Sequence, residues 1–464
     1  DCPPHFYAHG QNPQYQAFGS LMHYANRVCT LIDGGHANPT AAILYHGESD
    51  WAGDFESNGP AAAALSQGQI DYHIIPADVF SETDKYRTQL TDGALLINGT
   101  AYRALIISGC EYLTHSAAEG ALAASAKGVQ VVITGQGVGG ISDTDPGTAG
   151  RLLTGLKELP VIPAGHLAQW LRERDIYDMQ LGTPDDQITF YHYTTADEEL
   201  YLFLNENPGR SYRGSACVCA AGVPYRYDAW TNQLVKIPFE KKEERTEVHL
   251  EISPLELQII VFSPQEQNTA DACLFPEDGQ QKTDSWIRIP LNHFLVSRAK
   301  ADQYPEFSEP EAAPESERGL VSMARVYPDF SGWYRYETDF ATEEDLSADR
   351  EEQTGDDTEP ACAAFLEIED VYEYARVYVN GTDCGDRTAL PYRWEISGCL
   401  RPGINHVRID TATTPEREIR AMGEDVYCMN IHHPFSPTGI TGRTVIYYEK
   451  AAGRRTDCSR MDEI

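Results

Sequence analysis

Four carboxylates follow a short apolar segment near the start of the sequence. The apolar segment covers residues 41–45, and the carboxylates are Glu48, Asp50, Asp54 and Glu56. A carboxylate can act as a general acid or base, so Glu48 and Asp50 are candidate catalytic residues. His46 and Trp51 lie beside them and could supply a hydrogen bond and a flat stacking surface for a ligand. The alternative is a polar loop that ends the strand and touches a neighbouring domain.

Two further patterns resemble chemical sites. Residues 135–140 have the spacing G-x-G-x-x-G, which can place a pyrophosphate at a helix N-terminus. Because Ile-Ser-Asp-Thr-Asp-Pro follows instead of an apolar helix, we interpret the motif as a flexible turn. Cys110 follows the predicted strand at residues 105–108 and precedes a helix, as a nucleophile would. It needs a base such as His166 oriented by Glu173, and these two are not spaced as a His-x-Glu pair, so we favour a degenerate site.

The sequence gives little sign of a metal or cofactor. Cys217-x-Cys219 and His432-His433 have no partner pair at zinc spacing and are interpreted as structural. Residues 343–359 contain nine carboxylates and one arginine, Arg350, which is typical of a solvated loop. A structural calcium ion is the alternative there, although the Asp-x-Asp-x-Asp-Gly spacing is missing.

The elements that would position these residues begin with a helix. Asn12 and Pro13 supply an N-cap and a first helical residue, and apolar residues from 18 to 32 follow at helical spacing. From Thr40 onward, predicted strands alternate with helices, which is typical of a parallel sheet with crossover helices. The predicted strands are residues 41–45, 72–75, 94–97, 104–107 and 129–134, and the predicted helices are residues 60–69 and one opened by a capping box at residues 116–119 and ended at 127–128.

Antiparallel sheets are predicted for the rest of the chain. Residues 188–203, 247–250 and 257–262 alternate apolar and polar side chains and fit a small antiparallel β domain. Residues 266–320 are rich in Glu, Pro, Asp and Gln and are interpreted as a linker, with one strand allowed at residues 286–294. After it, residues 332–340, the hairpin dipeptide Asn380-Gly381 and residues 400–410 predict a β-sandwich.

Composition limits the partners of the protein. The net charge is −35 over 464 residues, which argues against a nucleic-acid partner because phosphate binding requires clustered Lys and Arg. No apolar run approaches the ~18 residues that a membrane span needs. The eleven cysteines are scattered and imply no disulfide framework, which favours a reducing cytoplasm. The sequence begins at Asp1 without Met, and we expect an unseen segment before it.

Several short words in the sequence resemble glycoside hydrolases. The words at residues 330–336 (FSGWYRY), 377–381 (VYVNG) and 400–405 (LRPGIN) resemble the galactose-binding-like jelly roll of family 2-type enzymes. The words at residues 6–14 (FYAHGQNPQ), 24–27 (YANR) and 44–51 (LYHGESDW) resemble the region after the catalytic barrel in family 106, the α-L-rhamnosidase type. The strand and helix pattern of residues 37–165 is similar to the flavodoxin-like, amidotransferase-like domain of family 42 β-galactosidases.

The resemblance implies a domain order and a function. The order is the end of an upstream barrel (1–36), a flavodoxin-like domain (37–165), a small antiparallel β domain (166–265), an acidic linker (266–320), a jelly roll (321–450) and a polar tail (451–464). In these barrels two carboxylates cleave the glycosidic bond, and they would precede Asp1. Tyr7, His9 and Asn12 would then border the sugar site, with His46 and Trp51 as further contacts.

The expected protein is therefore the accessory, non-catalytic part of a glycosidase that acts on an oligosaccharide or glycoside. One alternative is a stand-alone lectin or scaffold with a sugar platform at Trp333, Tyr392 or Trp394 of the sandwich. A cysteine-dependent, amidotransferase-like enzyme is a third interpretation.

Overall fold

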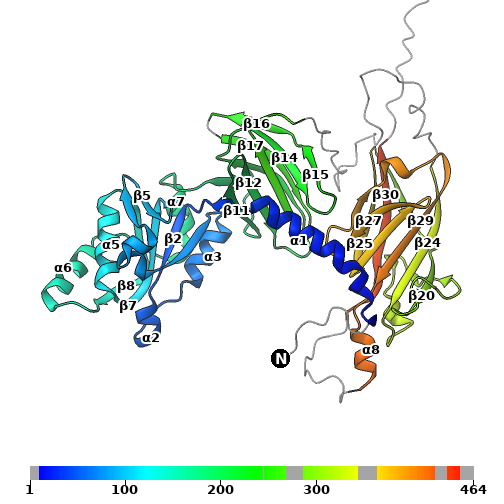
Figure 1. Ribbon diagram of the computed structural model, residues 1–464, viewed down its shortest axis with the longest axis horizontal. Coiled ribbons are helices and arrows are strands. Elements are labelled where there is room, and N and C mark those ends of the chain that lie inside the picture. The colour runs from blue at the N-terminus through cyan, green and yellow to red at the C-terminus, as the bar shows by residue number, and fades with distance from the viewer. Residues whose placement is uncertain (1–9, 244, 268–285, 343–362, 424–435, 450–464) are drawn as a thin grey trace, which may run out of the picture. The chain divides into compact units, whose positions relative to one another are not determined.

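The chain forms two compact units (Figure 1). The computed structural model describes residues 10–243, 245–267, 286–342, 363–423 and 436–449. The mixed unit contains Arg27–Ala272, and the terminal unit contains Asp1–Asn26 together with Cys273–Ile464. The chain is mixed α/β, with one parallel sheet and several antiparallel sheets, as predicted. None of the described helices has the length and apolar character required to cross a membrane.

A five-stranded parallel sheet lies in the first part of the mixed unit. Its spatial order is β3-β2-β7-β8-β9. The strands are β2 (Ala41–Tyr45), β3 (Tyr72–Pro76), β7 (Ala104–Leu113), β8 (Gln130–Ile141) and β9 (Val161–Ile162). If the five strands are numbered by their order along the chain, their order across the sheet is 2-1-3-4-5, which is common in doubly wound sheets. The direction of winding reverses between β2 and β7, and this is where such sheets usually bind ligands.

Helices cover both faces of this sheet. Leu44 packs in one core with α5 (His115–Ala126) and α6 (Pro146–Leu156), while Ile43 packs in the other with α3 (Gly59–Gln67) and α7 (Leu167–Arg172). This explains why β2 is apolar at successive positions. Two short helices and a small antiparallel sheet complete this part: α2 (Gly47–Ala52), α4 (Thr83–Tyr86), β4 (Gln89–Thr91), β5 (Ala94–Ile97) and β6 (Thr100–Tyr102).

The start of α5 differs from the prediction. Thr114, and not Ser116, is the N-cap, because its side chain accepts a hydrogen bond from the N–H of Ala117. The predicted capping box therefore lies inside the helix. The predicted end is confirmed, since Lys127 is the C-cap and Gly128 has a φ of +91°, a conformation that favours glycine.

Two antiparallel sheets form the rest of the mixed unit. The larger has the order β1-β11-β12-β18-β14-β15 and the smaller β10-β13-β17-β16. Their strands are β1 (His36–Ala37), β10 (Met179–Leu181), β11 (Ile188–Thr194), β12 (Glu199–Asn205), β13 (Tyr212–Val218), β14 (Val223–Asp228), β15 (Gln233–Lys236), β16 (Phe239–Lys242), β17 (Arg245–Ile252) and β18 (Leu257–Ser263). Side chains of both sheets, such as Phe203 and Leu250, share one core, so they form a sandwich.

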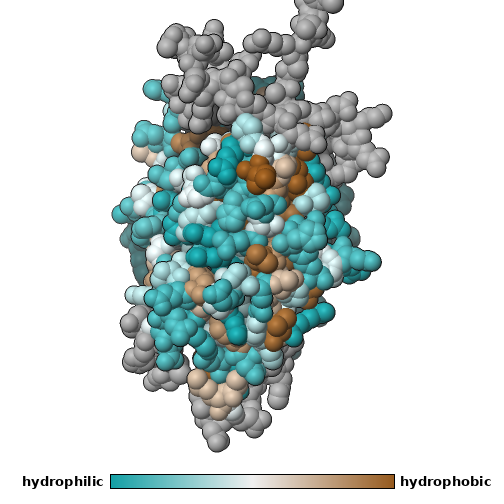
Figure 2. Space-filling view, turned by 90° about the vertical axis from the view of Figure 1, so that its right-hand side faces the viewer, coloured by the Kyte–Doolittle hydropathy of each residue, from teal (hydrophilic) through white to brown (hydrophobic). Residues whose placement is uncertain are grey.

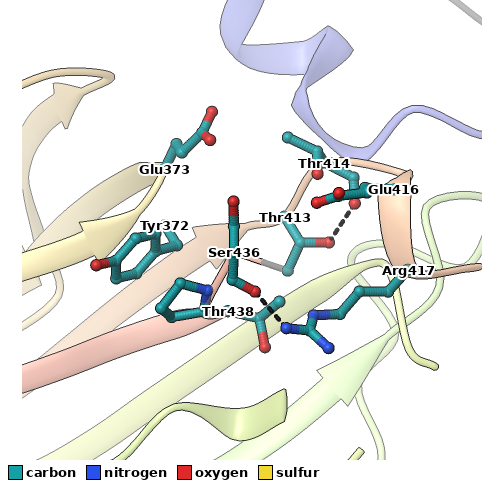
Figure 3. A pocket seen from close by; sticks show the side chains of 9 residues that line it. Tyr372, Glu373, Thr413, Thr414, Glu416, Arg417, Ser436 and Thr438 are labelled. Carbon is teal, nitrogen blue, oxygen red and sulfur yellow. Dashed lines mark hydrogen bonds between the residues drawn. The ribbon is translucent and has the colours of Figure 1, made fainter. Parts of the chain in front are cut away.

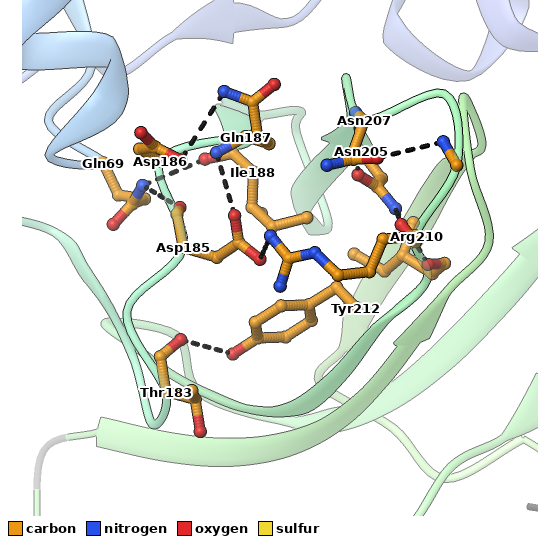
Figure 4. Close-up of polar contacts among 12 residues, drawn as sticks. Gln69, Thr183, Asp185, Asp186, Gln187, Ile188, Asn205, Asn207, Arg210 and Tyr212 are labelled. Carbon is orange, nitrogen blue, oxygen red and sulfur yellow. Dashed lines mark hydrogen bonds and ion pairs between the residues drawn. The ribbon is translucent and has the colours of Figure 1, made fainter.

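A buried glutamine links the parallel sheet to this sandwich (Figure 4). The side-chain N–H groups of Gln69, which follows α3, donate to the carbonyl oxygens of Asp185 and Ile188 at 2.9 and 3.0 Å. The carboxylate of Asp185 in turn pairs with Arg210 at 2.8 Å. Because each buried polar group has a partner, this junction within the mixed unit is specific in geometry.

Helix α1 (Phe18–Ile32) follows a 3-10 turn at Pro13–Ala17, for which the side chain of Asn12 accepts a hydrogen bond from the N–H of Gln14 at 3.1 Å. The predicted cap is thus correct, but it caps the 3-10 turn. None of the α1 residues is fully buried. Val28, Leu31 and Ile32 pack against apolar residues of the larger sheet of the mixed unit.

The terminal unit is a sandwich of two antiparallel sheets. One has the order β22-β23-β30-β25-β28, with β19 also paired to β30, and the other has the order β21-β20-β24-β29-β26-β27. The elements are β19 (Trp286–Leu291), β20 (Leu295–Ala299), β21 (Glu311–Ala312), β22 (Glu315–Ser316), β23 (Gly319–Leu320), β24 (Trp333–Thr342), β25 (Ala364–Tyr372), β26 (Tyr374–Val379), β27 (Thr382–Arg387), β28 (Arg393–Glu395), β29 (Gly403–Ala412), α8 (Glu416–Ala421) and β30 (Gly439–Glu449). On the face shown in Figure 2, apolar side chains form small separate groups in a largely hydrophilic surface.

Two predictions for the terminal unit have different outcomes. The hairpin at Asn380-Gly381 is confirmed, with φ values of +52° and +83° between β26 and β27. The strand allowed at residues 286–294 of the predicted linker is present as β19, whereas residues 295–320, interpreted as linker, supply β20 to β23. These strands are short or lie at sheet edges, so they contain many polar residues and resemble a linker in composition.

Candidate functional site

The predicted carboxylates lie where the parallel sheet reverses its winding. Beyond the end of β2, residues 54–56 return and pair with an extension of β7. The N–H of Glu56 donates to the carbonyl oxygen of Gly109, and the N–H of Glu111 donates to that of Asp54, each at 2.7 Å. β8 also extends here, because Cys110 pairs with Val138. The predicted loop is therefore ordered at the carboxyl edge of the sheet.

Glu56 occupies the glycine motif. Its Oε1 accepts a hydrogen bond from the N–H of Gln136 at 3.0 Å. A Cβ added to Gly135, which has a φ of +73°, would lie 1.6 Å from Oε2 of Glu56, and one on Gly109 would lie 3.2 Å from the carboxyl carbon. Residues 135–140 thus belong to β8 and bind the chain's own carboxylate, which corrects the flexible-turn interpretation. A carboxylate in this position also disfavours a phosphate ligand.

His46 and Glu48 are held inside this edge. His46 is 1% exposed, and its Nε2 donates to the carbonyl oxygen of Glu56 at 2.9 Å. Within the described residues, Nδ1 of His46 and Oε2 of Glu48 are buried and have no hydrogen-bond partner. Buried acceptors of this kind are normally paired with protein or ordered water. Both acceptors are enclosed by the protein, so the partner that fits them is a small donor such as an ordered water molecule.

Asp50 and Trp51 lie on α2 and face solvent. The hydroxyl of Tyr45 donates to Oδ2 of Asp50 at 2.6 Å, and this bond raises the pKa of Tyr45. Trp51 is 83% exposed, and Phe55 and Tyr112 are 43% and 37% exposed. Large apolar side chains with this exposure on ordered elements are informative, since most tryptophans are largely buried. We call Trp51, Phe55 and Tyr112 the aromatic edge.

The aromatic edge is rigidly supported. Oγ of Ser49 accepts from the N–H of Tyr112 at 2.7 Å and donates to its carbonyl oxygen at 2.8 Å, which fixes α2 against β7. The ring of Tyr112 lies over Gly53 and Gly140, where a Cβ would approach it to 3.1 and 3.0 Å. Phe55 and Tyr112 were not identified as candidate residues from the sequence. For Phe55 a signal was present, because the alternation Asp54-Phe55-Glu56 indicates a short strand.

The other three predicted site residues are Tyr7, His9 and Asn12. Tyr7 and His9 lie outside the described residues. Asn12 caps the 3-10 turn of the terminal unit. The structure thus brings together His46, Glu48, Asp50 and Trp51 from the predicted set, along with Asp54 and Glu56.

Cys110 is a strand residue and not a nucleophile after a strand. It lies within β7 and is 5% exposed, and burial, with a smaller contribution from the charge of Glu48, raises its pKa to about 12. The core around Cys110 contains α5 and α6, whereas Leu167, next to His166, packs in the core on the opposite face of the sheet. Glu173 accepts a hydrogen bond from Gln169 at 3.0 Å. These contacts support the degenerate interpretation.

The described residues contain no cluster of three or more His, Cys, Asp or Glu side chains that could hold a metal ion. Cys217 and Cys219 are free and partly exposed. His432-His433 and the acidic run at residues 343–359, where calcium was considered, lie outside the described residues.

A small hollow lies in the terminal unit (Figure 3). It is lined by Tyr372, Glu373, Thr413, Thr414, Glu416, Arg417, Ser436, Pro437 and Thr438. Two of its polar side chains are already paired, since Arg417 donates to the carbonyl oxygens of Pro328 and Ser436 and the hydroxyl of Thr413 donates to the carbonyl oxygen of Thr414. The space holds about one water molecule, so we assign no sugar to it.

The aromatic platform considered for a lectin is also absent. Trp333, Tyr392 and Trp394 are 2%, 5% and 1% exposed and belong to the packed interior of the terminal unit. They cannot stack on a ligand at the surface.

A buried histidine lies between two carboxylates in the mixed unit, and the sequence analysis missed it. Nδ1 of His192 is 3.0 Å from Oδ2 of Asp178, and Nε2 is 3.5 Å from Oε2 of Glu199. The imidazole stacks on Tyr201 with ring centroids 4.3 Å apart. The signal was available, because the alternation of β11 points Ile188, Phe190 and His192 to the same inward face.

This charge cluster makes stability depend on pH. Burial alone would lower the pKa of His192, but hydrogen bonds and charges from Asp178 and Glu199 outweigh it and raise the pKa to about 9. The unfolded value is about 6.5. The stabilisation is thus fully present below about pH 6.5 and is lost as the pH rises through about 9.

We expect the free energy of unfolding of the mixed unit to fall by about 2–4 kcal/mol between about pH 6.5 and pH 9.5. Urea titrations followed by circular dichroism at several pH values measure this slope. The variant His192→Gln cannot titrate, so its slope over the same range should be much smaller. Equal slopes in the two proteins would contradict the assignment.

Neither a protein-family model nor a curated protein matches the sequence. The structure of the rhamnosidase from Novosphingobium sp. PP1Y has a TM-score of 0.65 and 18% identity, covering 94% of this chain and 41% of that chain. A β-galactosidase from Bacillus circulans sp. alkalophilus has a TM-score of 0.33 and 11% identity, covering 54% of this chain and 44% of its own. A β-glucuronidase from an uncultured Clostridium sp. has a TM-score of 0.25 and 15% identity, covering 38% and 30%.

The likeness to the rhamnosidase shows a shared fold across almost all of this chain, which spans about two fifths of the length of that protein.

Proposed function

We propose that this chain is an accessory, non-catalytic part of a glycoside hydrolase of the family 106 type. The observation that carries the proposal is the fold shared with a rhamnosidase over 94% of this chain. The parent reaction would be hydrolysis of a terminal glycosidic bond, with an α-L-rhamnoside as the substrate. The catalytic acid and base would lie in the part of the parent that this chain does not contain.

The domain identities are part of the same proposal. The strand order 2-1-3-4-5 supports a flavodoxin-like domain in the mixed unit. The two antiparallel sheets of the terminal unit, with their shared core, support a galactose-binding-like jelly roll. The exposed side chains of Leu21 and Met22 on α1 support packing of this helix against a further domain, the expected barrel.

The aromatic edge would provide the contact with sugar. The flat ring of Trp51 offers a surface on which the apolar C–H face of a pyranose can stack. Asp50 and Asp54 lie near Trp51 in the chain, and the carboxylate of Glu111 accepts a hydrogen bond from the N–H of Asp54 at 2.9 Å. Carboxylates accept hydrogen bonds, and sugar hydroxyls donate them. His46 is buried, and its bond to the carbonyl oxygen of Glu56 would support the edge from within.

Neither Glu48 nor Asp50 is placed as a catalyst in this proposal. Asp50 is bound to the hydroxyl of Tyr45, and Glu48 is partly enclosed beside Cys110. We expect no hydrolysis of aryl α-L-rhamnosides by this chain alone. Turnover that disappears in Glu48→Gln would overturn the non-catalytic role.

A binding experiment tests the sugar contact. Methyl α-L-rhamnoside should bind with a Kd of about 1–10 mM, and Trp51→Ala should weaken binding at least ~10-fold, a loss of about 1.4 kcal/mol. Ligand-observed NMR measures the affinity. Tyr191→Ala is the matched control, since Tyr191 is another aromatic residue of the mixed unit and is 56% exposed. An equal effect of both substitutions, or no binding by the unsubstituted chain, would contradict the proposal.

A further inference from the structure

Two cysteines in the terminal unit face each other. Sγ of Cys384 lies 3.6 Å from Sγ of Cys399. Cys384 is in β27, and Cys399 ends a 3-10 turn at Ser397–Cys399 that precedes β29. Both are free and partly exposed, and both pack at the margin of the unit's core. Among the described cysteines, these two have sulfur atoms in contact with each other, so the pair is a candidate for covalent modification.

The surrounding contacts hold the two sulfur atoms near each other. The side-chain amide of Asn380 donates to the carbonyl oxygen of Cys399 at 2.8 Å, and the indole N–H of Trp394 donates to that of Gly385 at 3.1 Å. The first bond ties the hairpin to the 3-10 turn, and the second fixes the strand next to Cys384. Because the backbone on both sides is fixed, the sulfur atoms cannot diffuse apart as they would on a flexible loop.

We propose that Cys384 and Cys399 form an oxidation site that closes into an intramolecular disulfide when the protein meets a low-molecular-weight disulfide such as oxidised glutathione. A disulfide bond is about 2.05 Å long, so the sulfur atoms must approach by about 1.5 Å (3.6 minus 2.05). Rotation about the Cα–Cβ bonds of the two residues supplies a movement of this size without a change of fold.

The reaction is a balanced exchange. One cysteine thiolate attacks a sulfur of the oxidised reagent, forms a mixed disulfide and releases one reagent thiolate, which takes up the proton that the cysteine lost. The second cysteine thiolate attacks the protein sulfur of the mixed disulfide and releases the second reagent thiol. The two protein thiols are oxidised by two electrons, and the reagent disulfide is reduced to two thiols.

The environment determines how fast this occurs. Burial, followed by the neighbouring Cys399, raises the pKa of Cys384 to about 12. Since the thiolate is the nucleophile, oxidation should be slow at neutral pH. As long as the pH stays below that pKa, the rate should rise about tenfold for each unit by which the pH is raised. The pair is thus protected from casual oxidation and responds to a sustained oxidising environment.

Closure would affect β27, an edge strand of its sheet. Asp386 in this strand accepts a hydrogen bond from the hydroxyl of Ser20, in the first half of α1, at 2.6 Å. A disulfide at Cys384 would restrain the strand that carries Asp386 and would therefore steady the attachment of Ser20 within the terminal unit. The redox state of the pair would set the stability of this edge.

The experiment uses the full chain with oxidised glutathione at about pH 8.5, followed by non-reducing peptide mass spectrometry. We expect a peptide pair joined through Cys384 and Cys399, lighter by two hydrogen atoms and separated by dithiothreitol. The oxidised protein should melt about 5 °C higher than the reduced protein. Cys384→Ser and Cys399→Ser should each carry one glutathione on the remaining cysteine and show no rise in melting temperature.

Two results would overturn the proposal. One is a stable mixed disulfide with glutathione on Cys384 or Cys399 of the unaltered chain without closure. The other is that both thiols stay free while Cys29, which is exposed, becomes modified and shows that the reagent is active. The assay does not depend on sugar binding, so its failure leaves the proposed function untouched.

Discussion

Replacing Asp178 by asparagine should lower the free energy of unfolding of the mixed unit by about 3–5 kcal/mol, because it breaks a buried ion pair and leaves one partner uncompensated. The side chains of His192 and Asp178 are 8% and 13% exposed, so solvent does little to screen the interaction. Asparagine has nearly the same shape as aspartate, so the loss of stability can be attributed to the removal of the negative charge. Urea unfolding at neutral pH measures it.

The control for this substitution lies three residues earlier. Asp175→Asn makes the same chemical change at a side chain that is 81% exposed and lies 3.9 Å from Arg245. Exposed ion pairs contribute about 0–1 kcal/mol, so the stability of this variant should be close to that of the unsubstituted protein. If Asp175→Asn and Asp178→Asn had equal effects, the buried cluster would not be the cause.

Replacing Gly135 by alanine should lower the free energy of unfolding by about 2–4 kcal/mol. Two costs add here: a left-handed backbone costs about 1–2 kcal/mol for a residue with a Cβ, and the displaced carboxylate loses its hydrogen bond. The φ of Gly135 is +73°, and its added Cβ would lie 1.6 Å from Oε2 of Glu56. The N–H of Gln136 would then be left without its partner.

Gly137→Ala separates the two costs. Gly137 has a φ of +89° and nothing within 4 Å of an added Cβ, so it has the backbone strain without the collision. It should lose only about 1–2 kcal/mol. In addition, Glu56→Ala combined with Gly135→Ala should be less destabilised than the sum of the two single variants. Additive losses would show that Glu56 does not occupy the glycine motif.

Local periodicity was sufficient to predict many of the elements. β2 and β3 were predicted from short apolar runs that alternate with helices, β24 from alternation and the hairpin between β26 and β27 from the Asn380-Gly381 dipeptide, and each of these signals spans a few residues. The strands at residues 295–320 were missed because they are short and carry many polar side chains. The boundary of α5 was misplaced because two hydroxyl residues, Thr114 and Ser116, compete for the N-cap.

The candidate site was predictable only in part. The carboxylates after β2 could be placed at the sheet edge, because a strand and its following loop are contiguous in sequence. Contacts between distant residues gave no local signal, as with Glu56 and Gln136, Asp178 and His192, or Cys384 and Cys399. The sequence of one strand does not specify which distant side chain will contact it in the folded protein.

The extension of β7 past β2 also bears on solubility. From Gly109 to Leu113 this strand has no β2 neighbour, and an unpaired strand edge is a site at which another chain can add a strand. Residues 54–56 pair with Gly109 and Glu111, and Ser49 takes both backbone groups of Tyr112. The segment that carries the candidate sugar contacts thus also closes the edge against intermolecular association and aggregation.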